Sequence, residues 1–377
     1  MKTLVSIVGA RPQIIKASAV SRAVSAVPDE LREIIVHTGQ HYDDKLSDAL
    51  FRELGVPAPA LNLEAGSGSH AEQTARMLPG LERFLQEVKP DGVILYGDTN
   101  STLAGALVAA RLYLPILHVE AGLRSEEMNM PEEVNRRCTD RVSTLLFAPT
   151  QRAMNNLIRE GFLSDNAYPP DPSHPRVFLT GDVMLDNQRY FLQQLSETEL
   201  LNERYPGDAP ALVTFHRESN TRDPENLGAI ASALLRLANQ GIPLILPLHP
   251  RTLASFGSLG LDHLLSALKQ HPGIVLSGPL TYLELLPLLR ECCIVLTDSG
   301  GLQKEAFFMG KPVVILRETT EWQEIVDTGW GLTSAIEQDA ILAAVESLMR
   351  SQPLEPPMMF GDGHAAERIR DLILQYL

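Results

Sequence analysis

"GVILYGDTNSTLAGALVAARLYLPILHVEAG", residues 92–122, decides the fold expected for this sequence. Two short apolar runs, 93–96 and 114–117, flank a stretch rich in alanine and leucine that suits a helix. The runs are continuous rather than alternating, so both faces of each strand are expected to be buried, as in a parallel sheet covered by helices. The segment therefore predicts a strand–helix–strand unit of an α/β fold.

The same alternation of apolar runs and helical patterns continues along the chain. Further strand candidates include "TLVSIVG", "ALVTFHR" and "CIVLTDSGG", and helical patterns lie at 18–27, 71–88, 101–111 and 226–240. A proline-rich stretch near 165–210 interrupts the alternation and marks a boundary. The sequence predicts two Rossmann-like, doubly wound parallel-sheet domains, 1–175 and 176–363, with a cleft between them. The last segment, 364–377, has the pattern of an amphipathic helix that could pack on either domain.

Composition narrows the classes of function. The formal charge is -15 over 377 residues, which argues against the basic surface that binds nucleic acid or anionic membranes. Three cysteines, two of them adjacent, give no disulfide framework, so a reducing compartment is expected. No apolar run approaches the roughly 20 residues of a membrane span. We therefore expect a soluble cytoplasmic protein that binds neither nucleic acid nor membrane.

Polar residues follow five of the predicted strands. Asp98 follows "VILYG", Glu120 follows "ILHV" and His216 follows "LVTF". His249 and Asp298 end two more strands of the second half. One such residue is usually a helix cap or a turn former. Five of them favour ligand binding, because ligands of this architecture bind outside the carboxyl ends of the strands.

The first candidate anion site is "GARPQIIK", residues 9–16. It leaves the first strand and enters a helix, which places Gly9, Arg11 and Lys16 around a helix N-terminus. The motif is not GxGxxG, so no dinucleotide cofactor is predicted. The alternative is a glycine turn beside a solvated arginine.

The second candidate is "TDSGGLQKEA", residues 297–306. Ser299, Gly300 and Gly301 can present consecutive N–H groups at the next helix N-terminus, which suits a diphosphate. Glu305 follows about a turn and a half later and could accept ribose hydroxyls. The alternative is a glycine-rich helix cap.

The candidate catalytic groups are three carboxylates, Asp98, Glu120 and Glu132, together with His216. Carboxylates that converge on one site suit the transfer of a proton that is hard to remove, such as one bound to carbon. Glu132 also has a structural interpretation, because it follows Pro131 in a first helical turn and lies four residues before Arg136. Glu133 and Arg137 have the same spacing.

His216 and Arg217 suit neutralisation of a leaving group. A metal could in principle bind His118, His216 and His249. These histidines lack a recognised ligand spacing, so we predict no metal.

Seven motifs together resemble the non-hydrolysing UDP-N-acetylglucosamine 2-epimerases. They are "GARPQIIKAS", "HTGQHYD", "YGDTNSTLAGALVAA", "HVEAGLRS", "MPEEVNR", "TDSGGLQKEA" and "ETTEW". The resemblance implies a GT-B-like fold in which the second domain holds UDP and the sugar lies between the domains. It also implies a homodimer, no cofactor, and a C-terminal helix, 364–377, that packs back on the first domain.

The resemblance implies a reaction in which UDP is eliminated across C1 and C2 to give a 2-acetamidoglucal, and then added back. Proton removal and return would fall to Asp98, Glu120 and Glu132, and His216 would lie near the diphosphate. Other residues are expected to contact the UDP-sugar because of their place in a motif or at the end of a strand. They are Arg11, Lys16, Arg217, His249, Ser299, Gly300, Gly301 and Glu305.

Three motifs depart from the form common in family members that act on UDP-N-acetylglucosamine. "GARPQ", "QKEA" and "TTEWQE" stand in place of "GTRPE", "QEEA" and "TTERPE", so Trp322 replaces an arginine. These variants resemble the branch that epimerises UDP-2,3-diacetamido-2,3-dideoxyglucuronic acid for O-antigen synthesis. The alternatives are a hydrolysing epimerase that releases N-acetylmannosamine and UDP, a GT-B glycosyltransferase, and a UDP-sugar sensor without catalysis.

Overall fold

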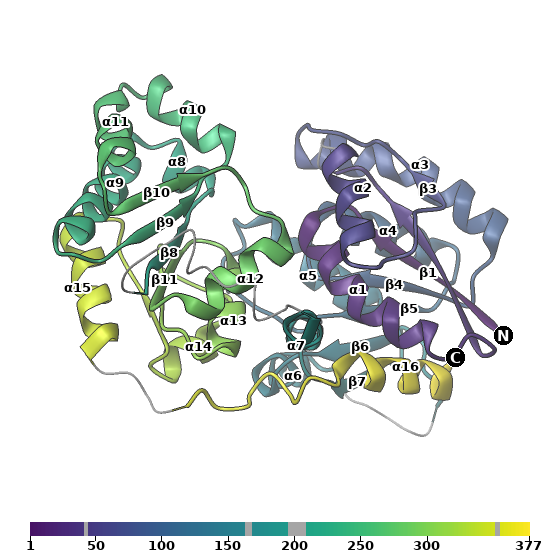
Figure 1. Cartoon of the computed structure of the whole chain (residues 1–377). Coiled ribbons are helices and arrows are strands. Elements are labelled where there is room, and N and C mark those ends of the chain that lie inside the picture. Colours follow the sequence, from purple (N-terminus) through teal and green to yellow (C-terminus); the bar gives the residue numbers. More distant parts are fainter. Residues whose placement is uncertain (41–43, 163–167, 195–208, 351–354) are drawn as a thin grey trace. The chain divides into compact units, whose positions relative to one another are not determined.

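A computed structural model describes residues 1–40, 44–162, 168–194, 209–350 and 355–377 (Figure 1). These residues form two compact units. Unit 1 comprises Met1–Tyr190 and Met358–Leu377, and unit 2 comprises Phe191–Pro357. The last three residues of the motif "HTGQHYD", 41–43, lie outside the described residues.

Unit 1 is built on a parallel sheet. Its strands are β1 (Lys2–Val8), β2 (Leu31–His37), β3 (Leu61–Asn62), β4 (Gly92–Tyr96), β5 (Ile116–Val119), β6 (Leu145–Ala148) and β7 (Arg176–Leu179). The described strands follow the order β3-β2-β1-β4-β5-β6-β7, which is the Rossmann order with one strand added at the β6 edge. Every residue of β4 and β5 is buried, which confirms the burial of these strands on both faces.

Helices cover both faces of this sheet. They are α1 (Arg11–Ser25), α2 (Asp44–Glu53), α3 (His70–Val88), α4 (Asn100–Arg111), α5 (Pro131–Val142), α6 (Gln151–Arg159), α7 (Val183–Gln194) and α16 (Ala365–Tyr376). Met77 and Leu81 of α3 share one core cluster with Val93 and Leu95 of β4. The motif "GARPQIIK" enters α1, as predicted, and the helical pattern at 18–27 covers only the second half of this helix, which begins at Arg11.

The C-terminal helix α16 packs against α1 in unit 1 (Figure 1). Ile369 and Ile373 are fully buried, and the Tyr376 ring lies 5.3 Å from that of Phe178 on β7. Asp186 of α7 accepts a hydrogen bond from the N–H of Ala366 at 2.7 Å. A carboxylate from a different helix therefore satisfies an N–H group in the first turn of α16.

Asp186 makes the stability of unit 1 depend on pH. Burial raises its pKa from an ordinary 3.8 to about 6, although the Ala366 and Ala365 N–H groups oppose the shift. Between pH 3.8 and about pH 6, the Asp186 carboxyl is therefore protonated in the folded state and ionised in the unfolded state. The contribution of Asp186 is full below about pH 4 and is lost as the pH rises through about 6. The difference corresponds to about 3 kcal/mol at most.

Asp186→Asn is expected to raise the stability of unit 1 at pH 8 by about 1–2 kcal/mol, because the neutral amide can still accept from Ala366. Near pH 4 the variant should match the wild type. Calorimetry at both pH values measures the difference, and Asp371→Asn, an exposed change on α16, is the control. An equal effect at both pH values would show that ionisation of Asp186 plays no part.

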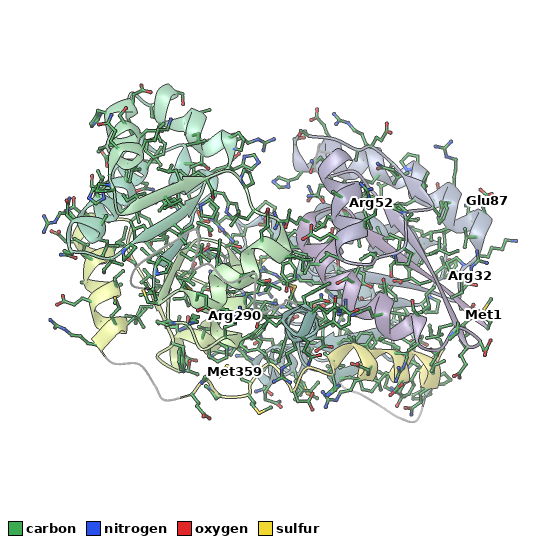
Figure 2. All side chains as sticks on the ribbon, viewed as in Figure 1. Met1, Arg32, Arg52, Glu87, Arg290 and Met359 are labelled. Carbon is green, nitrogen blue, oxygen red and sulfur yellow. The ribbon has the colours of Figure 1, made fainter. Side chains whose placement is uncertain are left out.

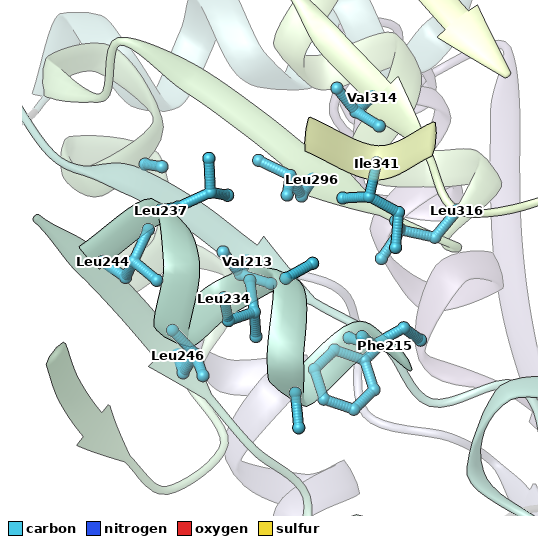
Figure 3. Packing of buried hydrophobic residues seen from close by; sticks show 14 of the residues in the cluster. Val213, Phe215, Leu234, Leu237, Leu244, Leu246, Leu296, Val314, Leu316 and Ile341 are labelled. Carbon is cyan, nitrogen blue, oxygen red and sulfur yellow. The ribbon is translucent and has the colours of Figure 1, made fainter. Parts of the chain in front are cut away.

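Unit 2 repeats the architecture with a second parallel sheet. Its strands are β8 (Ala211–Thr214), β9 (Leu244–Pro247), β10 (Ile274–Ser277), β11 (Ile294–Thr297), β12 (Val313–Ile315) and β13 (Gly331–Thr333). Across the described residues their order is β10-β9-β8-β11-β12-β13, again the Rossmann order. Leu234 of α9 and Ile341 of α15 pack on Val213 and Leu296 in the largely aliphatic core of this sheet (Figure 3).

The helices of unit 2 are α8 (Glu218–Thr221), α9 (Pro224–Asn239), α10 (Pro250–Ser258), α11 (Asp262–Gln270), α12 (Tyr282–Glu291), α13 (Gly300–Phe308), α14 (Gln323–Asp327) and α15 (Gln338–Arg350). Charged side chains such as Arg32 and Glu87 of unit 1 are exposed (Figure 2). The two Rossmann-like sheets confirm the predicted fold class. The strand order reverses between β1 and β4 in unit 1 and between β8 and β11 in unit 2.

Candidate active site

The chain leaves β1 through Gly9 and enters α1 almost at once. Gln13, in the first turn of α1, accepts hydrogen bonds from the N–H groups of Gly9 and Ala10 at 2.9 and 3.2 Å. Its Nε2 donates to the carbonyl of Tyr96, at the end of β4, at 2.9 Å. A Cβ at Gly9 would overlap the hydroxyl of Ser101. Gln13 and the glycine therefore fix the loop after β1 against the end of β4.

The two cations predicted to surround the start of α1 have different environments. Arg11 is the first residue of the helix and is exposed. Lys16 is 8% exposed, and its Nζ lies 2.5 Å from Oε1 of Glu120. Lys16 therefore pairs with a carboxylate of its own chain, and Arg11 is the cation of this loop that reaches solvent.

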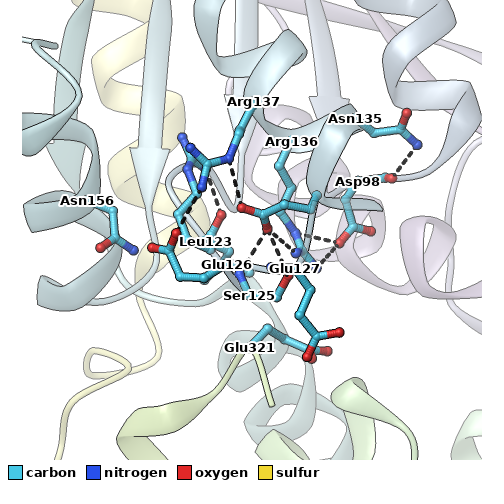
Figure 4. A network of polar contacts seen from close by, with 12 residues as sticks. Asp98, Leu123, Ser125, Glu126, Glu127, Asn135, Arg136, Arg137, Asn156 and Glu321 are labelled. Carbon is cyan, nitrogen blue, oxygen red and sulfur yellow. Dashed lines mark hydrogen bonds and ion pairs between the residues drawn. The ribbon is translucent and has the colours of Figure 1, made fainter. Parts of the chain in front are cut away.

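Asp98 follows β4 and is held by a buried arginine of α5. Nε and Nη2 of Arg136 lie 2.9 and 2.6 Å from Oδ2 of Asp98 (Figure 4). Asn135 donates to the backbone carbonyl of Asp98 at 2.9 Å. Because the Asp98 side chain remains 23% exposed, its carboxylate is fixed in place and still accessible.

Glu120, the residue after β5, has an unusual backbone. Its φ is +70°, a left-handed conformation that is disfavoured for a residue with a Cβ. Such strain concentrates at functional sites. A Cβ added at Gly97 would lie 3.0 Å from Nζ of Lys16 and 3.4 Å from Oε1 of Glu120. The Lys16–Glu120 ion pair therefore packs directly on the turn that precedes Asp98.

The adjacent glutamates at the start of α5 differ in role. Glu133 is fully buried and accepts hydrogen bonds from the Ser125 N–H and from Arg136 and Arg137, at 2.9–3.0 Å. Burial would raise the pKa of Glu133, but these donors together lower it. Glu132 is half-buried, and no described residue pairs with it.

The predicted helical pairs at this position are half right. Glu133 and Arg137 are paired at 2.9 Å, as expected from their spacing. Arg136 pairs with Asp98 and Glu133 rather than with Glu132. Tertiary contact with the end of β4 therefore takes precedence over the local i,i+4 contact.

A buried charge network underlies this region and was not predicted as a unit. His118 is fully buried on β5, with Nδ1 2.7 Å from Oδ1 of Asp140. Arg124 lies 2.9 Å from the same carboxylate and binds Glu160 through two nitrogens at 2.6 and 2.7 Å. Burial would raise the pKa of Asp140, but His118 and Arg124 together lower it. The sequence signal was a histidine within the apolar strand, which indicates a buried and partnered side chain.

In unit 2, Asp298 organises the ends of β8 and β11. Its buried carboxylate accepts hydrogen bonds from the N–H groups of His216 and Arg217 at 2.9 Å and from Asn220 at 3.0 Å. Nε of Arg217 also donates to the Asp298 carbonyl at 3.1 Å. The His216 side chain is 58% exposed. Asp298 thus fixes the backbone that presents the imidazole and the guanidinium.

The glycine motif opens α13, as predicted. Ser299 is the N-cap, and Gly300 and Gly301 form the first turn, whose N–H groups have no acceptor within the helix. A Cβ at Gly300 would overlap Oε1 of Glu321, so this glycine also makes room for a carboxylate of the chain itself. Arg317 neutralises that carboxylate at 2.8 Å.

Two other predicted contacts are placed as follows. His249 is the N-cap of α10, where its Nδ1 accepts a hydrogen bond from the Arg251 N–H at 3.2 Å. Its side chain is exposed. Glu305 is 4% exposed and lies on α13, beyond the two glycines.

The sequence departures at 304 and 322 form a single contact. Nζ of Lys304 lies 4.1 Å from the ring centroid of Trp322, a cation–π geometry. Lys304 is 1% exposed and Trp322 is 2% exposed. The indole Nε1 would lie 3.5 Å from a Cβ at Gly300, so the pair supports the first turn of α13 from inside the unit. Side chains this buried present almost no surface to a ligand.

Across the described residues, no group of three or more His, Cys, Asp or Glu side chains has an arrangement suited to a metal ion. None of the described helices combines the length and the apolar character needed to cross a membrane.

Two Rossmann-like units with polar groups at the strand ends define a GT-B-like protein. Residues 23–374 match the model of the UDP-N-acetylglucosamine 2-epimerase family. The chain belongs to this family and is an enzyme of the epimerase type.

Relatives cover essentially the whole chain. The UDP-2,3-diacetamido-2,3-dideoxy-D-glucuronate 2-epimerase of Pseudomonas aeruginosa is 42% identical over 98% of this chain and 99% of its own length. The UDP-N-acetylglucosamine 2-epimerase of Methanocaldococcus jannaschii is 38% identical over 96% of each chain. A crystal structure of the M. jannaschii enzyme with UDP-GlcNAc and UDP covers 99% of each chain, with 36% identity and a TM-score of 0.86. The UDP-GlcNAc 2-epimerase of Neisseria meningitidis bound to UDP-GlcNAc gives a TM-score of 0.85 at 29% identity, over the full length of both chains.

Proposed function

We propose that this enzyme inverts C2 of a UDP-2-acetamido sugar without hydrolysis, and that it prefers UDP-2,3-diacetamido-2,3-dideoxyglucuronic acid to UDP-GlcNAc. The observation that carries the proposal is the set of carboxylates at the ends of β4 and β5 and at the start of α5. Asp98 has a buried cation within 2.6 Å and Glu120 has one within 2.5 Å. The 42% identity to the P. aeruginosa enzyme supports the preference for the uronate.

The proposed reaction has two stages. A carboxylate removes the C2 proton, the C–H electron pair forms the C1–C2 double bond, and the C1–O bond breaks so that UDP leaves with its electrons. UDP then adds back to C1 of the 2-acetamidoglucal while a proton is delivered to the opposite face of C2. Each transfer needs a positioned acid or base, which typically contributes about 10²–10⁴-fold to the rate.

The ion pairs support a division of roles among the acids. A neighbouring cation favours the charged form of a carboxylate. Asp98 and Glu120, paired with Arg136 and Lys16, therefore suit proton acceptance. Glu132, which no described residue neutralises, suits proton donation.

Unit 2 is proposed to bind the leaving group. The N–H groups at the start of α13 would hold the diphosphate, and the charges that Asp298 positions would neutralise it as the C1–O bond breaks. The proposed contacts of UDP are Arg11, His216, Arg217, His249, Ser299, Gly300, Gly301 and Glu305. The predicted contact of Lys16 with the substrate stays a prediction, and its ammonium lies against the carboxylate of Glu120.

Two expectations stay predictions: the homodimer that the family resemblance implies and the cytoplasmic location that the composition favours. The partner proposed for this chain is its UDP-sugar substrate.

The test is a competition in D2O between equimolar UDP-GlcNAc and UDP-2,3-diacetamido-2,3-dideoxyglucuronic acid, followed by proton NMR at C2. We expect the uronate to lose its C2 proton signal first and to give the manno isomer still attached to UDP. Exchange of UDP-GlcNAc first would refute the preference. Release of free sugar with UDP would indicate the hydrolysing reaction. Exchange in neither sugar would refute epimerisation and favour the transferase or the sensor.

A further inference from the structure

The histidine of β5 lies between two acceptors. His118 is fully buried, with Nδ1 2.7 Å from Oδ1 of Asp140 and Nε2 2.8 Å from the backbone carbonyl of Gly97. A carbonyl oxygen accepts and cannot donate, and a carboxylate does the same. Each of these contacts is therefore a hydrogen bond only when the ring nitrogen that makes it carries the hydrogen.

This histidine joins the turns that carry two of the proposed catalytic acids. Gly97 precedes Asp98 at the end of β4, and Asp140 also accepts a hydrogen bond, at 3.2 Å, from the N–H of Gly122, two residues after Glu120. The His118–Asp140 pair thus contacts the turn after β4 on one side and the turn after β5 on the other.

Both turns contain a left-handed residue, and the turn after β5 needs such support because its left-handed residue, Glu120, has a Cβ. Gly97 has a φ of +61° and Glu120 a φ of +70°. Glycine adopts this conformation freely, whereas a residue with a Cβ does so only when its surroundings fix it. His118 contacts the backbone carbonyl of Gly97 in the first turn, and Asp140 accepts a hydrogen bond from the N–H of Gly122 in the second.

We propose that His118 is a positioning residue for Asp98 and Glu120, and that its hydrogen bond to the Gly97 carbonyl sets the direction of the Asp98 carboxylate. This proposal rests on the proposed function, because it assumes that the two acids act on C2. His118 does not reach the substrate itself, since it has no exposed surface. A displacement of about 1 Å at a reacting group can cost about 10²-fold in rate.

Two isosteric variants separate the two hydrogen bonds. The amide nitrogen of glutamine overlays Nε2 of histidine, and that of asparagine overlays Nδ1. His118→Gln can therefore still donate to Gly97, and His118→Asn can still donate to Asp140. Each variant keeps one of the two contacts and loses the other, so the comparison sets the contact to Gly97 against the contact to Asp140.

We expect His118→Asn to lower kcat for C2 proton exchange in D2O about 10²-fold and His118→Gln to stay within about tenfold of the wild type. The Kd for UDP should be unchanged in both, because the proposed UDP contacts of unit 2 are untouched. A merely structural role would lower the melting temperature and kcat of the two variants together. Equal kcat values for the two variants, or a wild-type kcat in His118→Asn, would overturn the proposal.

A measurement on the wild type covers the case in which neither variant folds. Nitrogen-15 NMR of the imidazole should show Nε2 of His118 protonated. A ring without hydrogen on Nε2 would overturn the proposal, because it could not donate to the Gly97 carbonyl. A wild type that exchanges no C2 proton refutes the proposed function instead, which keeps the two failures distinct.

Discussion

Asp98→Asn, Glu120→Gln and Glu132→Gln are each expected to lower kcat by about 10²–10⁴-fold while UDP still binds. Each change keeps the shape of the side chain and removes its ability to take up or deliver a proton. UDP binding should persist, because the proposed contacts with the nucleotide lie mainly in unit 2. Turnover is measured by C2 proton exchange in D2O, and UDP binding by calorimetry.

The neighbouring residue Glu133 provides the matched control. Glu133→Gln leaves Arg136 and Arg137 without the carboxylate that both contact in the buried region. Loss of one partner of a buried ion pair typically costs about 3–5 kcal/mol. We therefore expect Glu133→Gln to lower the melting temperature of unit 1, whereas Glu132→Gln should leave it unchanged.

This contrast makes the assignment testable residue by residue. Turnover close to that of the wild type in any of the three variants would remove that residue from the proposed site. A fall in melting temperature in Glu132→Gln as large as that in Glu133→Gln would give Glu132 a structural role. Glu120→Gln also leaves Lys16 buried without its carboxylate, so its melting temperature should be compared with that of Lys16→Met.

The second large effect is expected at the buried contact between Lys304 and Trp322. Lys304→Glu would place an anion against the face of the ring, and Trp322→Arg would bury a second cation beside the lysine. Each single variant should lose about 3 kcal/mol of stability, because each replaces a favourable buried cation–π contact with an unfavourable one.

The double variant should recover most of this loss. Glutamate at 304 and arginine at 322 are the pair found in the common motifs "QEEA" and "TTERPE", and they would face each other as an ion pair. A coupling free energy of about 2–3 kcal/mol is expected from the double-mutant cycle. Both tryptophans, Trp322 and Trp330, lie in unit 2, so fluorescence of the retained Trp330 can follow unfolding of this unit in every variant with arginine at 322.

The cycle also tests whether these positions choose the substrate. Because both side chains are at most 2% exposed, we expect the double variant to keep the wild-type order of preference between the two UDP-sugars. A reversed preference would make the pair a substrate determinant. A double variant as unstable as the sum of the two single variants would show that the positions are not coupled.

The sequence alone determined the fold class and the family of this protein. A continuous apolar run such as 93–96 indicates a strand that is buried on both faces. A few consecutive residues are enough to recognise this pattern. The polar residues that end the strands, Asp98 and Glu120 among them, were predictable for the same reason. A parallel sheet always presents the residues after its strands along one edge.

The tertiary structure decided which charges meet. Lys16 and Glu120 are separated by 104 residues, and no local pattern indicates that they form an ion pair. Arg136 contacts Asp98 across 38 residues instead of Glu132 within its own helix. Such partners are set by strand order and by the close packing of the turns after β1, β4 and β5. Periodicity within a segment carries information about burial, whereas the pairing of distant charges depends on where the sheet brings those segments together.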